Sequence, residues 1–188
     1  MPDDTLIAAH LDGDETAFPR LVSRYIDAVY RVALRILGNE RDAEDTVQET
    51  FVKAWRHMKR FRRGENFRPW LLRIGHNSAV DIVRKRREVA FSEFGGDDTG
   101  PFSETILDAE ALPDEIAARI RDAKELGTLL EKLSAGDREV LLLHYQENLS
   151  FREIGEVLGK PLNTVKSTHR RALLALRELL APKGRPRA

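Results

Sequence analysis

Apolar residues recur at spacings of three and four along most of this chain, which is the period of a helix with one buried face. The first such stripe covers residues 16–37 and ends at Gly38. Asn39 is a good N-cap for a second helix, whose inward positions are Ala43, Val47, Phe51, Ala54 and then Trp55 or Met58. Pro69 suits the first turn of a third helix, whose inward positions are Trp70, Leu71, Ile74, Ala79, Ile82 and Val83. The pattern therefore predicts a helical domain over residues 1–90.

The helical period stops after residue 90. Residues 91–115 (FSEFGGDDTGPFSETILDAEALPDE) contain three glycines, two prolines and eight acidic residues, and no basic one. This composition predicts a flexible acidic linker, to which we assign 91–125; an ordinary soluble tether fits the composition equally well. The period then resumes, and a second small core is expected from Leu126, Leu129, Leu130 and Leu133. The predicted fold class is all-α, with two small helical domains, 1–90 and 126–188, joined by this linker.

The second domain contains the pattern of a helix-turn-helix. Ser150 can cap a helix that starts near Phe151, Gly159 stops it, and a short KPLN turn leads to a last helix from Thr164. Its predicted interior positions are Ile154, Val157, Leu158, Leu162, Val165, Leu173 and Leu176. On the other side of the last helix, the residues expected toward DNA are Lys166, Ser167, Thr168, Arg170 and Arg171. An αα-hairpin without a DNA role is the alternative.

The charge is distributed in blocks, although 31 basic and 31 acidic residues give a formal charge of zero. Residues 55–90 carry a net charge of +8 and residues 151–188 carry +6, while 91–115 carry −8. Two separate basic blocks are expected of a protein that binds nucleic acid at two places, because Lys and Arg neutralise phosphates and release counterions. Either block alone could also be a solvated helix face.

The second predicted helix has an acidic outward face. Its apolar stripe leaves Asp42, Asp45, Gln48 and Glu49 on the other side. This face could dock on a partner, or it could serve solubility while its first turn complements the helix dipole. The chemistry of these residues leaves both interpretations open.

The loop FRRGENFRPW, residues 61–70, places aromatic rings beside arginines and asparagine, ahead of a basic helix. Rings and guanidinium planes stack on bases, amides read base edges, and basic groups follow the backbone, so this combination suits single-stranded nucleic acid. Phe61, Phe67 and Trp70 could equally be core residues.

Several function classes find no support in the sequence. Cysteine is absent, which removes disulfides, thiol catalysis and cysteine metal sites. No nucleophile, metal cluster or phosphate-binding loop is visible, so we expect no catalytic residue, no cofactor and no metal site. A nuclease would need clustered carboxylates, and Asp42, Asp45 and Glu49 are separated from the basic loop. The N-terminus has no signal-peptide pattern and no stretch is long enough to span a membrane, so we expect a cytoplasmic protein without membrane insertion.

Two segments resemble a known family. DAEDTVQETFVKAW and LSFREIGEVLGKPLNTVKSTHRRAL, in this order and separated by a linker, resemble regions two and four of the sigma-70 family. The two-domain layout resembles the extracytoplasmic-function group of bacterial sigma factors, over roughly residues 5–181. The resemblance implies a specificity subunit that directs core RNA polymerase to promoters and assists promoter melting. A regulator that uses only its helix-turn-helix is the alternative, and it would leave the first half of the chain unexplained.

The resemblance also implies three sets of site residues. The polymerase-docking set is Asp42, Asp45, Gln48 and Glu49. The minus-ten set, which captures the non-template strand and holds an unstacked base, is Phe61, Arg62, Arg63, Asn66, Phe67, Arg73, Asn77, Arg84, Lys85, Arg86 and Arg87. The minus-thirty-five set is Asn163, Thr164, Lys166, Ser167, Thr168, Arg170 and Arg171.

The expected partners are core RNA polymerase, promoter DNA and an anti-sigma factor, as the resemblance implies. Thr168 and His169 depart from the family, which commonly has an arginine and then an aliphatic residue at these positions. We therefore assign no individual base contacts, and we expect His169 to be partly buried or to face phosphate.

Overall fold

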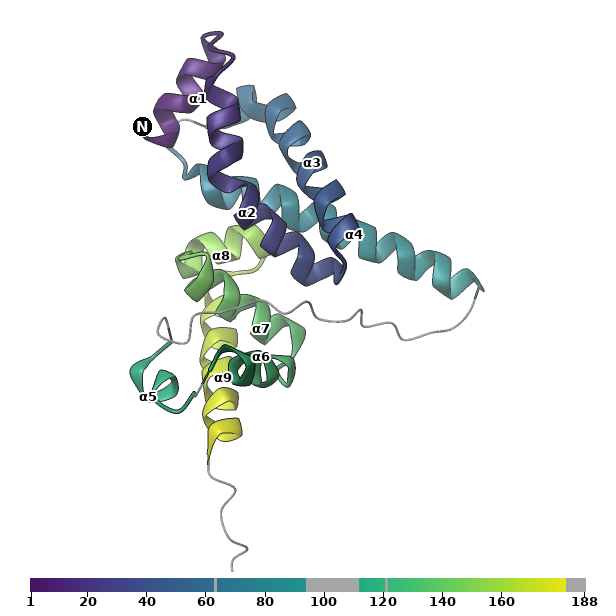
Figure 1. Ribbon diagram of the computed structural model, residues 1–188, viewed down its shortest axis with the longest axis vertical. Helices are drawn as coiled ribbons and strands as arrows, with labels where there is room; N and C mark the ends of the chain where they lie inside the picture. The colour runs from purple at the N-terminus through teal and green to yellow at the C-terminus, as the bar shows by residue number, and fades with distance from the viewer. Residues whose placement is uncertain (63, 94–111, 121, 182–188) are drawn as a thin grey trace, which may run out of the picture. The chain divides into compact units, whose positions relative to one another are not determined.

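The computed structural model describes residues 1–62, 64–93, 112–120 and 122–181. Two compact units divide the chain, unit 1 over Met1–Ser103 and unit 2 over Glu104–Ala188 (Figure 1). Every regular element among the described residues is helical. The prediction of an all-α fold with two helical domains is confirmed. None of the helices in the described ranges combines the length and the apolar character that crossing a membrane requires.

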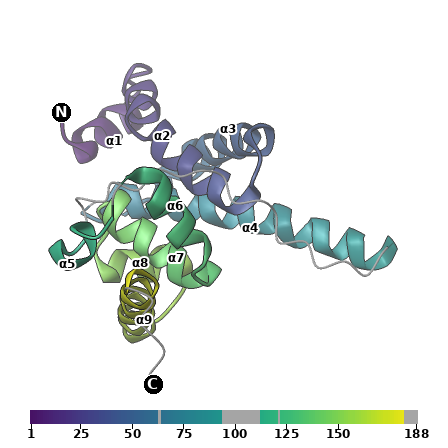
Figure 2. The same ribbon diagram turned by 60° about the horizontal axis from the view of Figure 1, so that its bottom comes forward.

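The described part of unit 1 contains four α-helices. They are α1 (Asp3–Leu11), α2 (Ala17–Leu37), α3 (Glu40–His57) and α4 (Phe67–Glu93), with a 3-10 turn, η1 (Met58–Arg60), after α3. The central helix α2 packs against α1, α3 and α4, and α3 also packs against α4. Figure 2 shows that the C-terminal turns of α4 project beyond α2 and α3. This projecting end carries the basic run that the sequence indicated.

The two predicted signals between α2 and α3 are present. Gly38 ends α2 in the left-handed conformation at φ 72°, a region that favours glycine, and its N–H donates to the Leu34 carbonyl over 2.8 Å. Asn39 caps α3, because its side-chain oxygen accepts from the Asp42 N–H at 2.9 Å. These two residues fix the point at which the acidic helix begins.

The buried stripe of α3 follows the predicted spacing and decides one open choice. Met58 is 1% exposed and belongs to the core, whereas Trp55 is 56% exposed. Close packing of the helices depends on small residues, since a Cβ at Gly75 of α4 would lie 3.2 Å from Val29 of α2. The predicted third helix starts at Phe67, two residues before Pro69.

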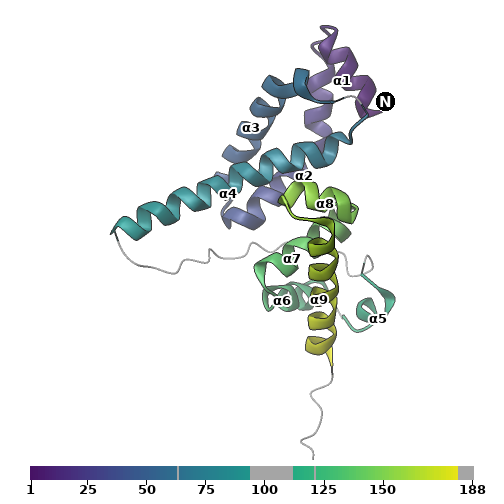
Figure 3. The ribbon, with the colours of Figure 1, turned by 180° about the vertical axis from the view of Figure 1, so that it is seen from behind.

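Unit 2 is built around the last helix. Its elements are α5 (Asp114–Ala117), α6 (Ala123–Glu131), α7 (Ala135–Leu141), a π-helical turn η3 (Leu142–Gln146), α8 (Phe151–Leu158) and α9 (Leu162–Leu180). Helices α5, α6, α7 and α8 all contact α9. Figure 3 shows α8 lying across the N-terminal end of α9. The expected core residues Leu126, Leu129, Leu130 and Leu133 are buried.

The helix-turn-helix comprises α8 and α9. Ser150 and Glu153 form a reciprocal capping box at the start of α8, and Gly159 ends the helix at φ 63°. Helix α9 begins at Leu162 rather than at the expected Thr164. Leu162 was expected in the interior, but it is 37% exposed, because it lies in the first turn of α9 before the helix reaches the core.

The structure differs from the expected boundaries of the linker, 91–125. Helix α4 continues to Glu93, and α5 and the start of α6 fall inside this range. Ile116 of α5 is fully buried, and Glu115 forms an ion pair with Arg177 of α9 over 3.2 Å. Residues 94–111, which carry much of the acidic composition, lie outside the described residues. Folded structure in unit 2 thus starts before the predicted boundary at 126.

Candidate functional site

One side of α3 forms an exposed surface with both charged and apolar residues. Asp45, Gln48 and Glu49 are all exposed, and Glu49 is paired with Lys53 at 2.8 Å. Val52 and Trp55 are exposed at the next positions of the same helical spacing. We call these five residues, Asp45, Gln48, Glu49, Val52 and Trp55, the α3 face. Sequence reasoning missed its apolar part because the apolar stripe of the helix also accommodated Trp55.

Asp42 differs from the other predicted docking residues. Its carboxylate accepts a hydrogen bond from Asn39 and forms an ion pair with Arg86 of α4. The bond from Arg86, and then the bond from Asn39, lower the pKa of Asp42 below its ordinary value. Asp42 was expected to dock on polymerase and Arg86 to contact minus-ten DNA, yet these two residues are bound to each other.

Phe61 and Phe67 are buried, with Phe67 only 1% exposed. The Phe67 ring centroid lies 5.6 Å from that of Phe61, 5.5 Å from that of Trp70 and 5.6 Å from that of Tyr25. In this arrangement the two phenylalanine rings have no open face on which a base could stack. Burial of these two rings stabilises the fold, and it fixes the loop to the core of unit 1. Of the two interpretations that the sequence left open for these rings, the core one describes this structure.

The polar residues of the loop are accessible. Gly64 adopts φ 88°, which allows the chain to turn, and Asn66 accepts a hydrogen bond from the Arg68 N–H at 3.2 Å. Arg62 is highly exposed, with its guanidinium 3.9 Å from Glu65. Arg63 lies outside the described residues.

Helix α4 presents a polar stripe in line with the loop. Arg73, Asn77 and Lys85 are exposed. Arg84 is exposed as well and pairs with Asp81 at 3.2 Å, a surface contact of little net strength that DNA could replace. Val80, which the sequence did not single out, is exposed on the same stripe. The side chain of Arg87 lies outside the described part of the structure.

The outward face of α9 carries most of the predicted minus-thirty-five residues. The exposed ones are Asn163, Thr164, Lys166, Ser167, Arg170 and Arg171. The Ser167 hydroxyl donates to the Thr164 carbonyl at 2.9 Å within the helix. These side chains lie on the first turns of a helix-turn-helix recognition helix, where base edges and phosphates are normally contacted.

Two predicted members of this set make contacts within unit 2. Thr168 is buried. Arg171 donates from Nε and Nη2 to Asp137 Oδ1 at 2.9 and 2.6 Å, and the Asp137 side chain is 8% exposed. Burial alone would raise the pKa of Asp137, but the hydrogen bonds from Arg171 and Ser134 outweigh it and lower that pKa. Arg171 thus joins α9 to α7, a tertiary contact that no local pattern reveals.

His169 belongs to a cluster of rings behind the recognition face. Its Nε2 lies 3.0 Å from the Tyr145 hydroxyl, and its ring centroid lies 5.2 Å from that of His144 and 4.8 Å from that of Phe151. Burial, and then the neighbouring His144, lower the pKa of His169. Of the two expectations for His169, partial burial is the one observed. The π-helical turn that brings His144 and Tyr145 here had no recognisable sequence signal.

The comparisons with known proteins cover both units. The family model for sigma-70 region 2 matches residues 21–89, and the model for sigma-70 region 4 matches residues 123–176. A helical unit with the first match and a helix-turn-helix unit with the second define a DNA-binding transcription initiation factor. Within the described residues, no group of three or more histidine, cysteine or acidic side chains could hold a metal ion.

Two curated relatives are similar over nearly the whole chain. ECF RNA polymerase sigma factor SigW of Bacillus subtilis is 33% identical over 89% of this chain and 91% of its own length. RNA polymerase sigma factor CnrH of Cupriavidus metallidurans is 35% identical over 95% of this chain and 94% of its own length. The chain belongs to the sigma-70 family, within the extracytoplasmic-function group of RNA polymerase sigma factors.

Two solved structures have similar folds. CnrH in complex with the cytosolic domain of CnrY is 29% identical, with a TM-score of 0.66, over 97% of this chain and 99% of that one. The sigma factor RpoE in complex with the anti-sigma factor NepR, from Bartonella quintana, is 27% identical, with a TM-score of 0.68, over 89% of this chain and 98% of that one.

Proposed function

We propose that this protein acts in the cytoplasm as a non-catalytic subunit that brings core RNA polymerase to two promoter elements and helps to open the duplex between them. The observation that carries the proposal is the pair of exposed surfaces on separately folded units. Unit 1 presents an acidic helix face beside a basic helix, and unit 2 presents a polar and basic recognition helix. A protein that only bound duplex DNA would not need the acidic and basic surfaces of unit 1.

The α3 face is proposed to dock on the polymerase. Asp45, Gln48 and Glu49 supply charge and hydrogen bonds, and Val52 and Trp55 supply apolar area that is exposed in the free protein. Exposed aromatic residues surrounded by polar ones are typical of protein interfaces. Asp42 is proposed to contribute at the edge of this surface through its pair with Arg86.

The loop and α4 are proposed to hold the melted strand at the minus-ten element. The described residues with exposed side chains for this task are Arg62, Asn66, Arg73, Asn77, Arg84, Lys85 and Arg86, the last of which also pairs with Asp42. Arg63 and Arg87 stay in the proposed set on the family resemblance. Phe61 and Phe67 are proposed to act indirectly, because they fix the loop that carries the polar residues.

The exposed residues of α9 are proposed to read the minus-thirty-five element. They are Asn163, Thr164, Lys166, Ser167, Arg170 and Arg171, and Arg171 also pairs with Asp137. Control by an anti-sigma factor is part of the proposal, since the RpoE neighbour was solved with the anti-sigma factor NepR and the CnrH neighbour with CnrY.

The direct test is run-off transcription with purified core polymerase on a promoter library, with and without this protein. We expect new start sites that depend on the protein. A folded protein that binds core polymerase and directs no initiation would contradict the proposal. Tight binding to duplex DNA without polymerase, and no initiation, would favour a regulator that uses only the helix-turn-helix.

A second experiment tests the α3 face by charge reversal. Asp45→Arg combined with Glu49→Arg should weaken binding to core polymerase by at least about tenfold, because two charges of the surface change sign. Binding of unit 2 to minus-thirty-five duplex should be unchanged. The matched control is Glu15→Arg combined with Asp27→Arg, an equal charge change at exposed positions outside α3. Equal loss of polymerase binding in both variants would show that the effect is one of net charge.

A further inference from the structure

One apolar residue is exposed within the polar stripe of α4. Val80 is 40% exposed. Its neighbours at spacings of three, four and seven along the helix are Asn77, Arg84 and Arg73, and all three are exposed as well. Residues three and four apart lie side by side on a helix surface, so Val80 shares a face with these polar residues. An apolar side chain thus lies within the surface that is proposed to hold promoter DNA.

The packing of unit 1 does not use the Val80 side chain. The core side of α4 at this level consists of Ser78 and Ala79, which are 3% and 0% exposed. Lys53 of α3 donates to the Ser78 hydroxyl at 2.9 Å, and Ala79 packs in one buried cluster with Ala33 of α2. Val80 lies one residue beyond Ala79, about 100° further around the helix. Its side chain is therefore directed away from both neighbouring helices.

Helix formation does not account for a valine at this position either. A β-branched side chain loses rotamer freedom against the preceding turn of a helix. Valine consequently ranks below alanine, lysine and glutamine in helix propensity, and any of these would suit an exposed position of α4 better. Neither the core nor the helix explains Val80, which leaves a contact outside the chain.

The chemistry of DNA indicates what an apolar side chain can recognise there. Thymine presents a C5-methyl group at its major-groove edge, and apolar side chains contact this group in protein–DNA interfaces. Cytosine, adenine and guanine present only hydrogen-bonding groups at the same edge. The methyl group lies outside the base-pairing edge, so it is accessible in duplex and in melted DNA alike.

The spacing along α4 suits contacts with successive bases. Val80 is three residues from Asn77, which corresponds to about 4.5 Å along the helix axis at about 1.5 Å per residue. Successive bases of one strand are about 3.4 Å apart. An amide and an apolar side chain at this separation can contact neighbouring bases, while Arg73 and Arg84 on the same face bind the backbone.

We propose that Val80 contacts the C5-methyl group of a thymine in the minus-ten element, at the base beside the one that Asn77 faces. The inference rests on the function proposed above, which assigns the α4 stripe to this element. The contact removes two apolar surfaces from water, so it favours thymine over a base without the methyl group. Val80 is thus a specificity-determining residue, whereas the arginines of the stripe bind any sequence.

The test replaces thymine by deoxyuridine, which keeps the base-pairing edge and lacks only the methyl group. Holoenzyme is reconstituted from the full chain and core polymerase. Initiation is measured on a promoter that the run-off library identifies, with each thymine of the minus-ten element replaced in turn on either strand. We expect one position at which deoxyuridine lowers initiation about fourfold, the contribution of one buried methyl-sized group.

Val80→Ala should abolish the difference between thymine and deoxyuridine at that position. Alanine has the higher helix propensity, so the loss would not result from unfolding of α4. The matched control is Ile26→Ala, which removes an apolar side chain of nearly equal exposure, 41%, from α2. This control should keep the difference.

Three results would overturn the proposal while initiation itself continues. They are the absence of any position sensitive to deoxyuridine, a difference that persists in Val80→Ala, and a difference that Ile26→Ala also removes. Absence of initiation from every promoter with the unaltered protein would instead refute the proposed function, and with it this inference.

Discussion

Two adjacent arginines of α9 illustrate how position decides the role of a side chain. Arg170 and Arg171 are both exposed, but Arg171 also forms an ion pair with the buried Asp137 of α7 through three hydrogen bonds. Removal of Arg171 leaves a buried carboxylate without its cation, which is costlier than the loss of an exposed charge.

We predict opposite effects of alanine at these two positions. Arg170→Ala should change the free energy of unfolding by no more than about 0.5 kcal/mol and lower the salt slope of promoter binding by about one phosphate contact. Arg171→Ala should destabilise unit 2 clearly more than that. Thermal unfolding and a salt titration of DNA binding measure the two effects. Equal destabilisation by both substitutions would contradict the structural role of Arg171.

His169 is predicted to make the stability of unit 2 dependent on pH. Its pKa in the folded protein lies below the ordinary value of 6.5, so below that pH the unfolded chain binds the proton more readily. The free energy of unfolding should therefore fall as the pH decreases from about 6.5 toward the lower pKa of the folded state. Unfolding followed by circular dichroism at pH 7.5, 6.5 and 5.5 tests this.

The control for this experiment is a pair of histidine substitutions. His169→Leu, which restores the aliphatic residue common in the family, should reduce the dependence on pH. His57→Leu, at an exposed position of unit 1, should leave the dependence of unit 2 unchanged. A slope that His169→Leu does not alter would assign the effect to another group.

At the scale of elements, the turn between α8 and α9 depends on a glycine with no room for a side chain. A Cβ on Gly155 would lie 2.7 Å from the Lys160 carbonyl oxygen, which is part of the backbone of the turn. Gly127, in α6, has no atom within 4 Å of the same position.

We predict that alanine has opposite signs at these two glycines. Gly155→Ala should destabilise unit 2 by about 1–3 kcal/mol, because the turn must shift to admit the methyl group. Gly127→Ala should stabilise it by about 0.5–1 kcal/mol, the gain from replacing glycine inside a helix. Chemical denaturation of both variants provides the measurement, and stabilisation by Gly155→Ala would show that the turn is not tightly packed.

Helical periodicity and capping residues were sufficient to predict α2, α3 and the helix-turn-helix, because those signals are local. Gly38, Asn39, Ser150 and Gly159 all act within one turn of the residues that they terminate or cap. Periodicity could not choose between Trp55 and Met58, since both spacings fit one helix face. That choice depends on which neighbouring helix covers the face.

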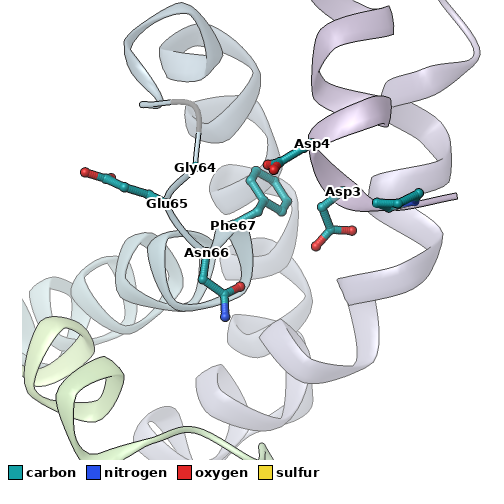
Figure 4. A pocket seen from close by; sticks show the side chains of 7 residues that line it. Asp3, Asp4, Gly64, Glu65, Asn66 and Phe67 are labelled. Carbon is teal, nitrogen blue, oxygen red and sulfur yellow. The ribbon is translucent and has the colours of Figure 1, made fainter.

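The charged site residues were predictable as accessible, but their pairing was not, and neither was the burial of Phe61, Phe67 and Thr168. Asp42 and Arg86 are 44 positions apart in the sequence, and Asp137 and Arg171 are 34 apart. Such pairs form only when separate helices pack, so Asp42, Arg86 and Arg171 looked available for a partner outside the chain. An open cavity lined by Asp3, Asp4 and loop residues 64–67 has the same origin, because α1 and the loop meet only in the folded unit (Figure 4).

At the scale of the whole molecule, the two units have separate cores and a useful difference in composition. Both tryptophans, Trp55 and Trp70, lie in unit 1. Trp70 packs against Phe61 and Phe67, with ring centroids 5.1 and 5.5 Å away. Tryptophan fluorescence therefore follows unit 1, whereas helical ellipticity follows both units.

We predict that the units unfold as two transitions. Gly155→Ala should lower the midpoint of the part of the ellipticity change that belongs to unit 2, and it should leave the midpoint of tryptophan fluorescence unchanged. The comparison needs one protein and two probes in the same denaturant series. A fluorescence midpoint that moves together with ellipticity would mean that the units unfold as a single cooperative body.

The pair between Asp42 and Arg86 has a consequence for how this protein can be recombined with its relatives. A hybrid that takes α3 from a relative without an acidic residue at position 42 would leave Arg86 without its ion-pair partner. A hybrid that takes α4 from a relative without a basic residue at position 86 would leave Asp42 without its partner. The two helices should therefore be inherited and exchanged as one block. Across relatives, we expect the residues at these two positions to change together rather than singly.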